Sequence, residues 1–355
     1  MSENGSENGV SSSRDEEPHI SVLLSVAPPD GTTRFVDQVT RHAPPNIHFQ
    51  FFSWRIALFG RWDVFHVHWP EFLIRGRTTA VEAIRTILFM LFLLRLLSTR
   101  KKVVRTLHNI TPHKAGSGLE SFLLRLLDKR TNVFVRLNNE TPIPSDAPSV
   151  HIPHGHYRDV LNSAARRPPI GGRLLYFGRI ESYKNVERLV RVFGHLSQAD
   201  LELRVVGKGS AELQERIVNA SSGDDRVSIR FGFVPDDDMV AEMTAAQLIV
   251  LPYTEMHNSG IVLVALSLDR PVLVPKTPAN ALLADEVGKH WIRLFDGELN
   301  EADLLEALEA TTALPASGPE LSGRDWDTVA TSYAKAYRFA LGPGTPRSPT
   351  SGKSK

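Results

Sequence analysis

The segment VFHVHWPEF places His68, Trp69 and Glu71 at the end of an expected strand. An aromatic ring can cover the apolar face of a sugar, and a neighbouring carboxylate can accept its hydroxyl protons. This combination predicts a sugar-binding site; the structural alternative is a core tryptophan beside a glutamate that caps a turn. His66 would share a strand face with His68, but no third ligand has convincing spacing for zinc, so we predict no metal site.

Further histidines follow two other expected strands. TLHNITPHK contains His108 and Asn109, and HIPHGHYR contains His154 and His156. Each histidine alone can be an ordinary hydrogen-bonded residue. Their shared position favours a common polar site, because ligands of parallel sheets bind beyond the carboxyl ends of the strands.

The segment GRIESYKN has the features of a phosphate site. Gly178 allows close approach of the backbone, and Arg179 and Lys184 can converge on one anion. A helix expected directly afterwards would add backbone N–H groups at its start. A surface loop with two solvated cations is the structural alternative. In VVGKGSAEL, Gly207 and Lys208 fit a second nucleotide contact, although a tight strand-to-helix turn has the same pattern.

The segment YTEMHNSGI lies between the apolar runs LIVLPY and IVLVALSL. Glu255, His257, Asn258 and Ser259 need polar partners at such a junction, and a ligand would supply them. The backbone at Gly260 would open the following helix and offer further N–H groups.

All these segments follow short apolar runs that alternate with helix-length spacers. The predicted strands are 20–26, 47–53, 64–69, 102–108, 132–138 and 149–154, then 173–178, 201–207, 227–232, 248–253, 271–276 and 291–295. This alternation predicts an α/β protein with parallel sheets. The Pro- and Gly-rich break at 162–172 separates two doubly wound, Rossmann-like domains that would face each other across an interdomain cleft.

The predicted domains are an N-terminal one at 18–165 and a C-terminal one at 166–323, followed by an amphipathic helix at 324–341. The polar segments 1–17 and 342–355 are expected to be disordered. The chain has 355 residues and no cysteine. This composition excludes disulfides and a cysteine nucleophile, and it suits a reducing compartment such as the cytoplasm.

The charge of the chain is unevenly distributed. Residues 18–168 contain 20 Lys and Arg against 10 Asp and Glu, a net charge of +10, whereas the whole chain carries +1. This asymmetry predicts an anionic partner, either a membrane surface or a polyanion. The apolar run ILFMLFLL at 87–94 is too short to span a bilayer. It is either a buried helix or part of a helix whose apolar and basic faces rest on a membrane.

As a set, HVHWPE, VVRTLHN, HGHYRD, MHNSG and ALSLDRPVL resemble the glycosyltransferases of the GT-B architecture, over about residues 18–341. Within that class the chain is most similar to the β-mannosyltransferases of xanthan assembly, which pass mannose from GDP-mannose to a polyprenol-diphosphate-linked oligosaccharide. The resemblance implies a nucleotide-sugar donor in the C-terminal domain and a lipid-linked acceptor in the N-terminal domain. It further implies exopolysaccharide assembly. From the basic N-terminal domain and the segment 79–102 we separately expect peripheral attachment to the anionic inner face of the cell membrane, and we expect no nucleic-acid partner.

Many retaining enzymes of this architecture carry two glutamates separated by seven residues, ahead of a proline that corresponds to Pro271. Aligned on that proline, the two positions are Met256 and Val264, and Glu255 is one position away. The missing pair favours an inverting enzyme. The alternatives are a retaining α-glycosyltransferase, a sugar-nucleotide epimerase, and a non-catalytic protein that binds sugar nucleotides.

An inverting transfer needs a general base on the acceptor hydroxyl, and the expected catalytic residues are Glu71, His68 and, behind them, His108. The donor would contact Gly178, Arg179, Lys184, Gly207, Lys208, Glu255, His257, Asn258, Ser259 and Gly260. The acceptor would contact Trp69, Asn109, His154 and His156. No acidic metal-binding motif is visible, so we expect no metal cofactor and expect protein cations to stabilise the leaving diphosphate.

Overall fold

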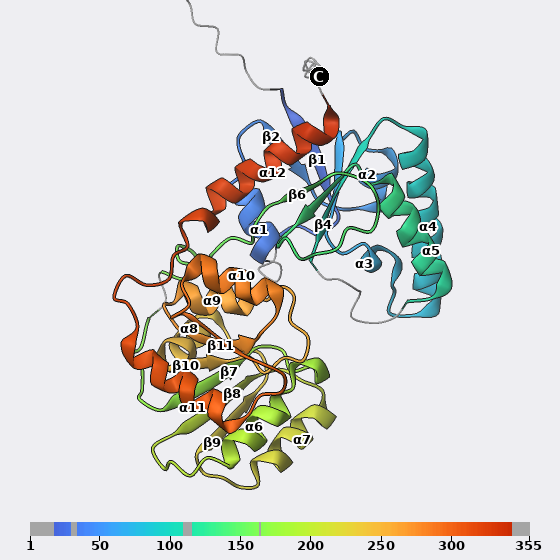
Figure 1. Ribbon diagram of the computed structural model, residues 1–355. Coiled ribbons are helices and arrows are strands. Elements are labelled where there is room, and N and C mark those ends of the chain that lie inside the picture. The colour runs from blue at the N-terminus through green and yellow to red at the C-terminus, as the bar shows by residue number, and fades with distance from the viewer. Residues whose placement is uncertain (1–17, 30–33, 109–115, 163–164, 343–355) are drawn as a thin grey trace, which may run out of the picture.

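The computed structural model describes residues 18–29, 34–108, 116–162 and 165–342, which form two α/β domains stacked end to end (Figure 1). All twelve predicted strands are present, each inside its predicted run. They form two six-stranded sheets in which every pairing between neighbouring strands is parallel.

The first domain alternates strands with short and long helices. Its elements are β1 (Ile20–Leu24), α1 (Arg34–Arg41), β2 (Ile47–Gln50), α2 (Trp54–Phe59), β3 (Val64–Val67), α3 (Glu71–Ile74), α4 (Thr79–Ser98), β4 (Lys102–Leu107), α5 (Gly118–Arg130), β5 (Val133–Arg136) and β6 (Ser149–His151). The strand order is β2-β1-β3-β4-β5-β6. From β1 the chain adds β2 on one side of the sheet, and from β3 onward it adds strands on the other side. The switch point therefore lies between the parallel strands β1 and β3, and such switch points are where these sheets bind ligands.

The second domain has the strand order β12-β11-β10-β7-β8-β9, the doubly wound order of dinucleotide-binding folds. Its elements are β7 (Arg173–Phe177), α6 (Val186–Gly194), β8 (Glu202–Gly207), α7 (Ala211–Ser221), β9 (Val227–Phe231), α8 (Asp236–Ala245), β10 (Leu248–Val250), α9 (Gly260–Ser267), β11 (Val272–Pro275), α10 (Pro278–Val287), β12 (Ile292–Phe295) and α11 (Glu301–Ala310). The switch point lies between β7 and β10, so the loops after these two strands flank the expected ligand site.

The last helix, α12 (Trp326–Leu341), leaves the second domain and packs on the first sheet (Figure 1). Its apolar positions recur at helical spacing, and Trp326, Val329, Tyr333 and Tyr337 are buried. The Tyr337 hydroxyl lies 2.8 Å from Nδ1 of His66 on β3. The C-terminal helix is therefore joined to the core of the first domain by both packing and a hydrogen bond.

Helix α4 covers the other face of the first sheet. Phe89, Phe92, Leu93 and Leu96 are buried in a core cluster with the strands. The opposite face exposes large apolar side chains, among them Leu94, which is 63% exposed. The interpretation of the 87–94 run as a buried helix is therefore wrong for half of its surface. Among the described residues, no helix combines the length and the apolarity needed to cross a bilayer.

Candidate functional site

The ends of β3 and β4 bring together residues that the sequence predicted separately. His68 and His108 each follow their strand directly, and Nδ1 of His68 lies 2.9 Å from Nε2 of His108. The Trp69 ring stacks on His108, with centroids 4.3 Å apart and planes 22° from parallel. Ser25, at the end of β1, accepts a hydrogen bond from the His68 backbone N–H at 3.0 Å. The pair therefore sits at the switch point of the first sheet.

Phe35 of α1 lies between the pair His68 and His108 and the linker that leads to the second domain. Its ring centroid lies 5.2 Å from that of His108 and 4.8 Å from that of His154. His154 Nε2 is 4.0 Å from the position that a Cβ on Gly260 would occupy. Because Gly260 opens helix α9 of the second domain, the histidines of the first domain lie beside the start of that helix.

Burial sets the charge of this histidine cluster, His68, His108 and His154. It lowers the pKa of His68 to about 3 and that of His154 to about 4. The pKa of His108 is also lowered, by burial first and then by the neighbouring His68 and His154. Desolvation disfavours the charged form of an imidazole, so the cluster is neutral near pH 7 and presents both donors and acceptors to a hydroxyl group.

His66 has a structural role. Its Nε2 lies 2.8 Å from the Thr106 hydroxyl, and its Nδ1 lies 2.8 Å from the Tyr337 hydroxyl. Both ring nitrogens of this fully buried side chain are thus satisfied inside the first domain. Among the described residues, no group of three or more His, Asp or Glu side chains is placed to hold a metal ion.

Glu71 is buried in a different environment from the histidine cluster. It is the first residue of α3, and its carboxylate stabilises the charged forms of Arg75 and Arg105. Arg105 neighbours Thr106, which faces α12, so alternation along β4 directs Arg105 to the α4 and α5 side of the sheet. The structure therefore places Glu71 among cations on that side.

The end of β7 holds a cation above a glycine. Gly178 has φ +132°, a conformation that favours glycine, and a Cβ there would meet only the Lys184 ammonium, at 3.9 Å. This ammonium lies 5.1 Å from the Tyr253 ring centroid. The Lys184 pKa is lowered to about 8, mainly by burial; Glu181 opposes this shift and the nearby Arg179 adds to it. Arg179 is exposed, 3.8 Å from Glu181.

A tight contact between two strand ends explains Gly207. A Cβ at this position would lie 1.8 Å from the Gly178 carbonyl oxygen, so only glycine fits. Lys208 is exposed, and its carbonyl accepts a hydrogen bond from Ile180 N–H at 2.8 Å. The approach of the two strand ends thus accounts for the glycine without a ligand.

The loop after β10, residues 251–259, divides its polar residues between solvent and the first domain. Glu255 is exposed, whereas Met256 and Val264 are 6% and 7% exposed and belong to the core. The positions that retaining relatives fill with carboxylates are therefore apolar core positions in this protein. Ser259 precedes α9 and hydrogen-bonds to Tyr253.

His257 and Asn258 bond to the first domain rather than facing an open site. Nε2 of His257 lies 2.7 Å from the Thr141 hydroxyl, and the Asn258 side-chain N–H₂ donates to the His108 carbonyl at 3.0 Å. Asn138 donates to the Asn258 side-chain oxygen at 2.8 Å. Sequence reasoning missed Asn138 and Thr141, although Asn138 lies in the tail of a predicted strand, the position that singled out the other site residues.

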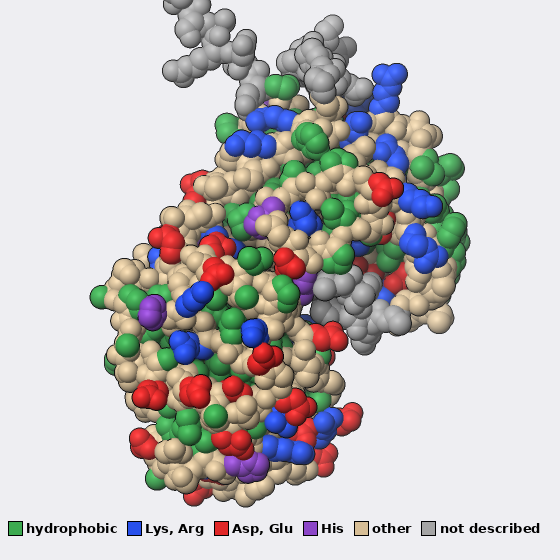
Figure 2. Space-filling model, in the orientation of Figure 1, with side chains coloured by type: hydrophobic (Ala, Val, Ile, Leu, Met, Phe, Trp, Pro, Cys, Tyr) green, Lys and Arg blue, Asp and Glu red, His purple; other side chains and the backbone are tan. Residues whose placement is uncertain are grey.

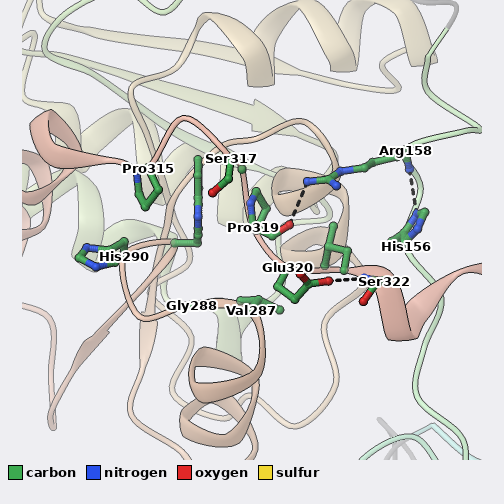
Figure 3. A pocket seen from close by; sticks show the side chains of 13 residues that line it. His156, Arg158, Val287, Gly288, His290, Pro315, Ser317, Pro319, Glu320 and Ser322 are labelled. Carbon is green, nitrogen blue, oxygen red and sulfur yellow. Dashed lines mark hydrogen bonds between the residues drawn. The ribbon is translucent and has the colours of Figure 1, made fainter.

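Two predicted acceptor contacts do not join this cluster. Asn109 lies outside the described residues. His156 lines a separate cavity of about 420 Å³, bounded by the start of β12 and by the segment before α12. In that cavity the His156 ring accepts a hydrogen bond from the Arg158 backbone N–H, as Figure 3 shows. Although only Gly155 separates the two histidines, the side chains of His154 and His156 lie in different surroundings.

Comparisons with known proteins agree with this architecture. The family described as Glycosyl transferases group 1 matches residues 171–311. The chain is 38% identical to the GDP-mannose:glycolipid 4-β-D-mannosyltransferase of Xanthomonas campestris pv. campestris, over 92% of this chain and 94% of that protein. Among solved structures, the HepE protein of Anabaena in complex with UDP and glucose has a TM-score of 0.63 at 12% identity, covering 90% of this chain and 99% of that one. Sucrose-phosphate synthase from Thermosynechococcus elongatus has a TM-score of 0.62 at 12% identity, covering 90% and 98%.

Proposed function

The chain belongs to the group 1 glycosyltransferases, in the family of the Xanthomonas GDP-mannose:glycolipid 4-β-D-mannosyltransferase, and we propose that it transfers mannose from GDP-mannose to a polyprenol-diphosphate-linked oligosaccharide with inversion. The protein is a glycosyltransferase of the GT-B fold. The observation that best supports the proposal is that the start of α9 lies beside the neutral histidine cluster of the first domain, while the loop before α9 supplies Tyr253 to a partly buried cation at the end of β7.

The donor diphosphate is proposed to bind at the end of β7. Lys184 is partly desolvated there, beside the exposed guanidinium of Arg179, and an anion would relieve the repulsion between these two cations. The backbone at Gly178 leaves open space in front of the ammonium. The start of α9 would add N–H groups and a favourable dipole. These groups would stabilise the leaving GDP without a metal ion.

The acceptor hydroxyl is proposed to meet its base in the first domain. His68 is the first candidate, because His108 bonds to its ring and would orient it. A base with a pKa of about 3 is weak, but the approach of an anionic acceptor would favour the protonated imidazole and raise this pKa. Glu71 is only the second candidate, because its carboxylate lies near Arg75 and Arg105 on the α4 and α5 side of the sheet, apart from the histidine cluster. Trp69 and His154 would line the path of the acceptor sugar.

A membrane surface is proposed to bind the helices α2 to α5. Helix α4 exposes Ile84, Ile87, Leu94 and Leu97, all more than half exposed. Within residues 53–131, as far as the structure describes them, every side chain of the exposed class that bears a charge is Arg or Lys. These residues are Arg55, Arg61, Arg77, Arg100, Arg125 and Lys129. Figure 2 shows green and blue side chains along this edge of the first domain. An apolar face rimmed by cations suits the cytoplasmic surface of an anionic membrane, where a lipid-linked acceptor resides.

A thermal-shift screen of nucleotide sugars tests the donor assignment. A ligand that binds the folded state raises the melting temperature, so GDP-mannose and GDP should both raise it more than UDP-glucose or UDP-glucuronate. A selective response to a UDP-sugar would refute GDP-mannose as donor while leaving the glycosyltransferase assignment intact.

A further inference from the structure

We propose that Asn138 and Thr141 form a latch that positions the loop 251–259 when the two domains meet. The inference rests on the proposed function, since it assigns this loop to the donor site. Asn138 follows β5 of the first domain, and its side-chain N–H₂ donates to the Asn258 side-chain oxygen at 2.8 Å and to the His257 carbonyl at 3.3 Å. The Thr141 hydroxyl lies 2.7 Å from His257 Nε2.

The Asn138 side chain is fixed by its own turn. Its oxygen accepts from the Glu140 backbone N–H at 2.8 Å and from the Thr141 hydroxyl at 3.2 Å. Both acceptor directions are thus used within the first domain, and the amide nitrogen is aimed at the second. Thr141 is only 2% exposed. A side chain that is ordered before contact loses less conformational entropy when the contact forms, which favours a positioning role.

The latch connects to the histidine pair. The Asn258 amide is held at both ends by the first domain, because its nitrogen donates to the His108 carbonyl at 3.0 Å. The ring of the same His108 bonds to His68 at 2.9 Å. The position of the Asn258 side chain therefore depends on His108, the same residue that would orient the proposed base His68.

The latch also connects to the proposed phosphate site. The loop 251–259 contributes Tyr253, whose hydroxyl bonds to Ser259 and whose ring lies under the Lys184 ammonium. Displacing the loop would therefore move the aromatic support of Lys184 and the start of α9 together. Asn138 and Thr141 contact neither proposed reacting group and act through the loop, so they are positioning residues.

The variant Asn138→Asp separates the latch from the turn. The aspartate keeps the oxygen that accepts from Glu140 and Thr141 but lacks the N–H₂ group that reaches Asn258. The matched control is Asn219→Asp, on the exposed surface of α7. We expect Asn138→Asp to accelerate amide hydrogen exchange within 251–259 by about tenfold, with β10 unchanged, because local opening follows the loss of stabilising contacts. Unchanged exchange in the loop would overturn the proposal.

Kinetics provide a second readout on the intact enzyme. Asn138→Asp should lower kcat/KM for the donor by about tenfold, mainly through a higher donor KM, since a misplaced loop costs positioning. Asn138→Ala and Asn258→Ala should be non-additive, because they remove the same contact. Two results would overturn the latch and leave Asn138 a purely structural role. One is full additivity of the effects of Asn138→Ala and Asn258→Ala, and the other is a donor KM of Asn138→Asp equal to that of Asn219→Asp. Absence of turnover in the wild type would count against the proposed function, whereas the exchange measurement would still decide the latch.

Discussion

Nδ1 of His68 lies 2.9 Å from Nε2 of His108, so two histidines from neighbouring strands share one proton-bearing contact. In such a pair one ring can take a proton while the other fixes its orientation, and we assign the proton to His68. We expect His68→Ala to lower the transfer rate by about 100-fold or more, the usual contribution of a general base, and His108→Ala to lower it less. Donor binding, measured by calorimetry with GDP, should be unchanged in both variants.

Glu71→Gln belongs in the same experiment, because it removes the second candidate base while keeping the shape of the side chain. It should also lower the rate and spare donor binding. The control is His195→Ala, at an exposed position beside Glu301 in the second domain. Full rates in both His68→Ala and Glu71→Gln would place the base elsewhere.

The stability of the fold should fall in acid because of the histidine cluster. Burial holds the pKa of His68 at about 3 and that of His154 at about 4 in the folded protein, below the usual value of a histidine in an unfolded chain. As the pH falls below that value, the unfolded state takes up protons that the folded state excludes. Each such histidine then costs up to about 1.4 kcal/mol per pH unit until its folded pKa is reached.

Thermal melting between pH 7 and 4 measures this loss. The variant His68→Gln should flatten the dependence by about one proton. An identical slope in His68→Gln and the wild type would show that His68 is not held neutral by the fold.

Donor affinity should depend on the charge of Lys184. Its pKa of about 8 means that the free protein loses this positive charge as the pH rises through 8. Affinity for GDP should therefore decline between pH 7 and 9. Lys184→Met should bind GDP about tenfold more weakly at pH 7, and Lys184→Arg should remove most of the pH dependence because arginine stays charged.

The exposed lysine Lys208 offers the matched control for the donor measurement. Lys208→Met should change GDP affinity less than Lys184→Met. Equal losses of GDP affinity in the two variants would show that Lys184 acts only through general electrostatic attraction and does not contact the phosphates.

Membrane binding should depend on the apolar face of α4 as well as on charge. Leu94→Glu places a carboxylate at a position that is 63% exposed, so the fold should tolerate it. Sedimentation with vesicles that contain anionic phospholipid should fall several-fold in this variant. Phe233→Glu, at an 84% exposed site in the second domain, is the control and should sediment like the wild type. Binding that ignores both Leu94→Glu and lipid charge would contradict the proposed surface.

The strands and the edge that carries the site could be predicted from the sequence, because apolar runs with polar tails encode both. Partners across the domain junction could not. Nothing in RLNNET indicates that Asn138 reaches His257 and Asn258, since the pairing spans about 120 residues and depends on how the two domains meet. Asn138 nevertheless ends the predicted strand 132–138, and this position at a strand end is the one that indicated the other site residues.

The predictions that changed most concern side-chain direction. HGH offered two similar histidines, but the non-strand backbone after β6 sends His154 to the junction and His156 to a cavity beside α10 and β12. The run at 87–94 has apolar residues on every side, so its periodicity did not reveal which face would be exposed. Only the packing of Phe89 and Phe92 against the first sheet settles this.

Anomeric NMR of the transfer product tests the central claim most directly. Full-length protein would be incubated with GDP-α-D-mannose and a lipid extract that contains the polyprenol-linked acceptor, and the new linkage would be assigned from its one-bond C–H coupling. The account predicts a β-linked mannose on the lipid-linked oligosaccharide. An α-linked product would contradict inversion, and absence of transfer from GDP-mannose alongside transfer from a UDP-sugar would contradict the donor.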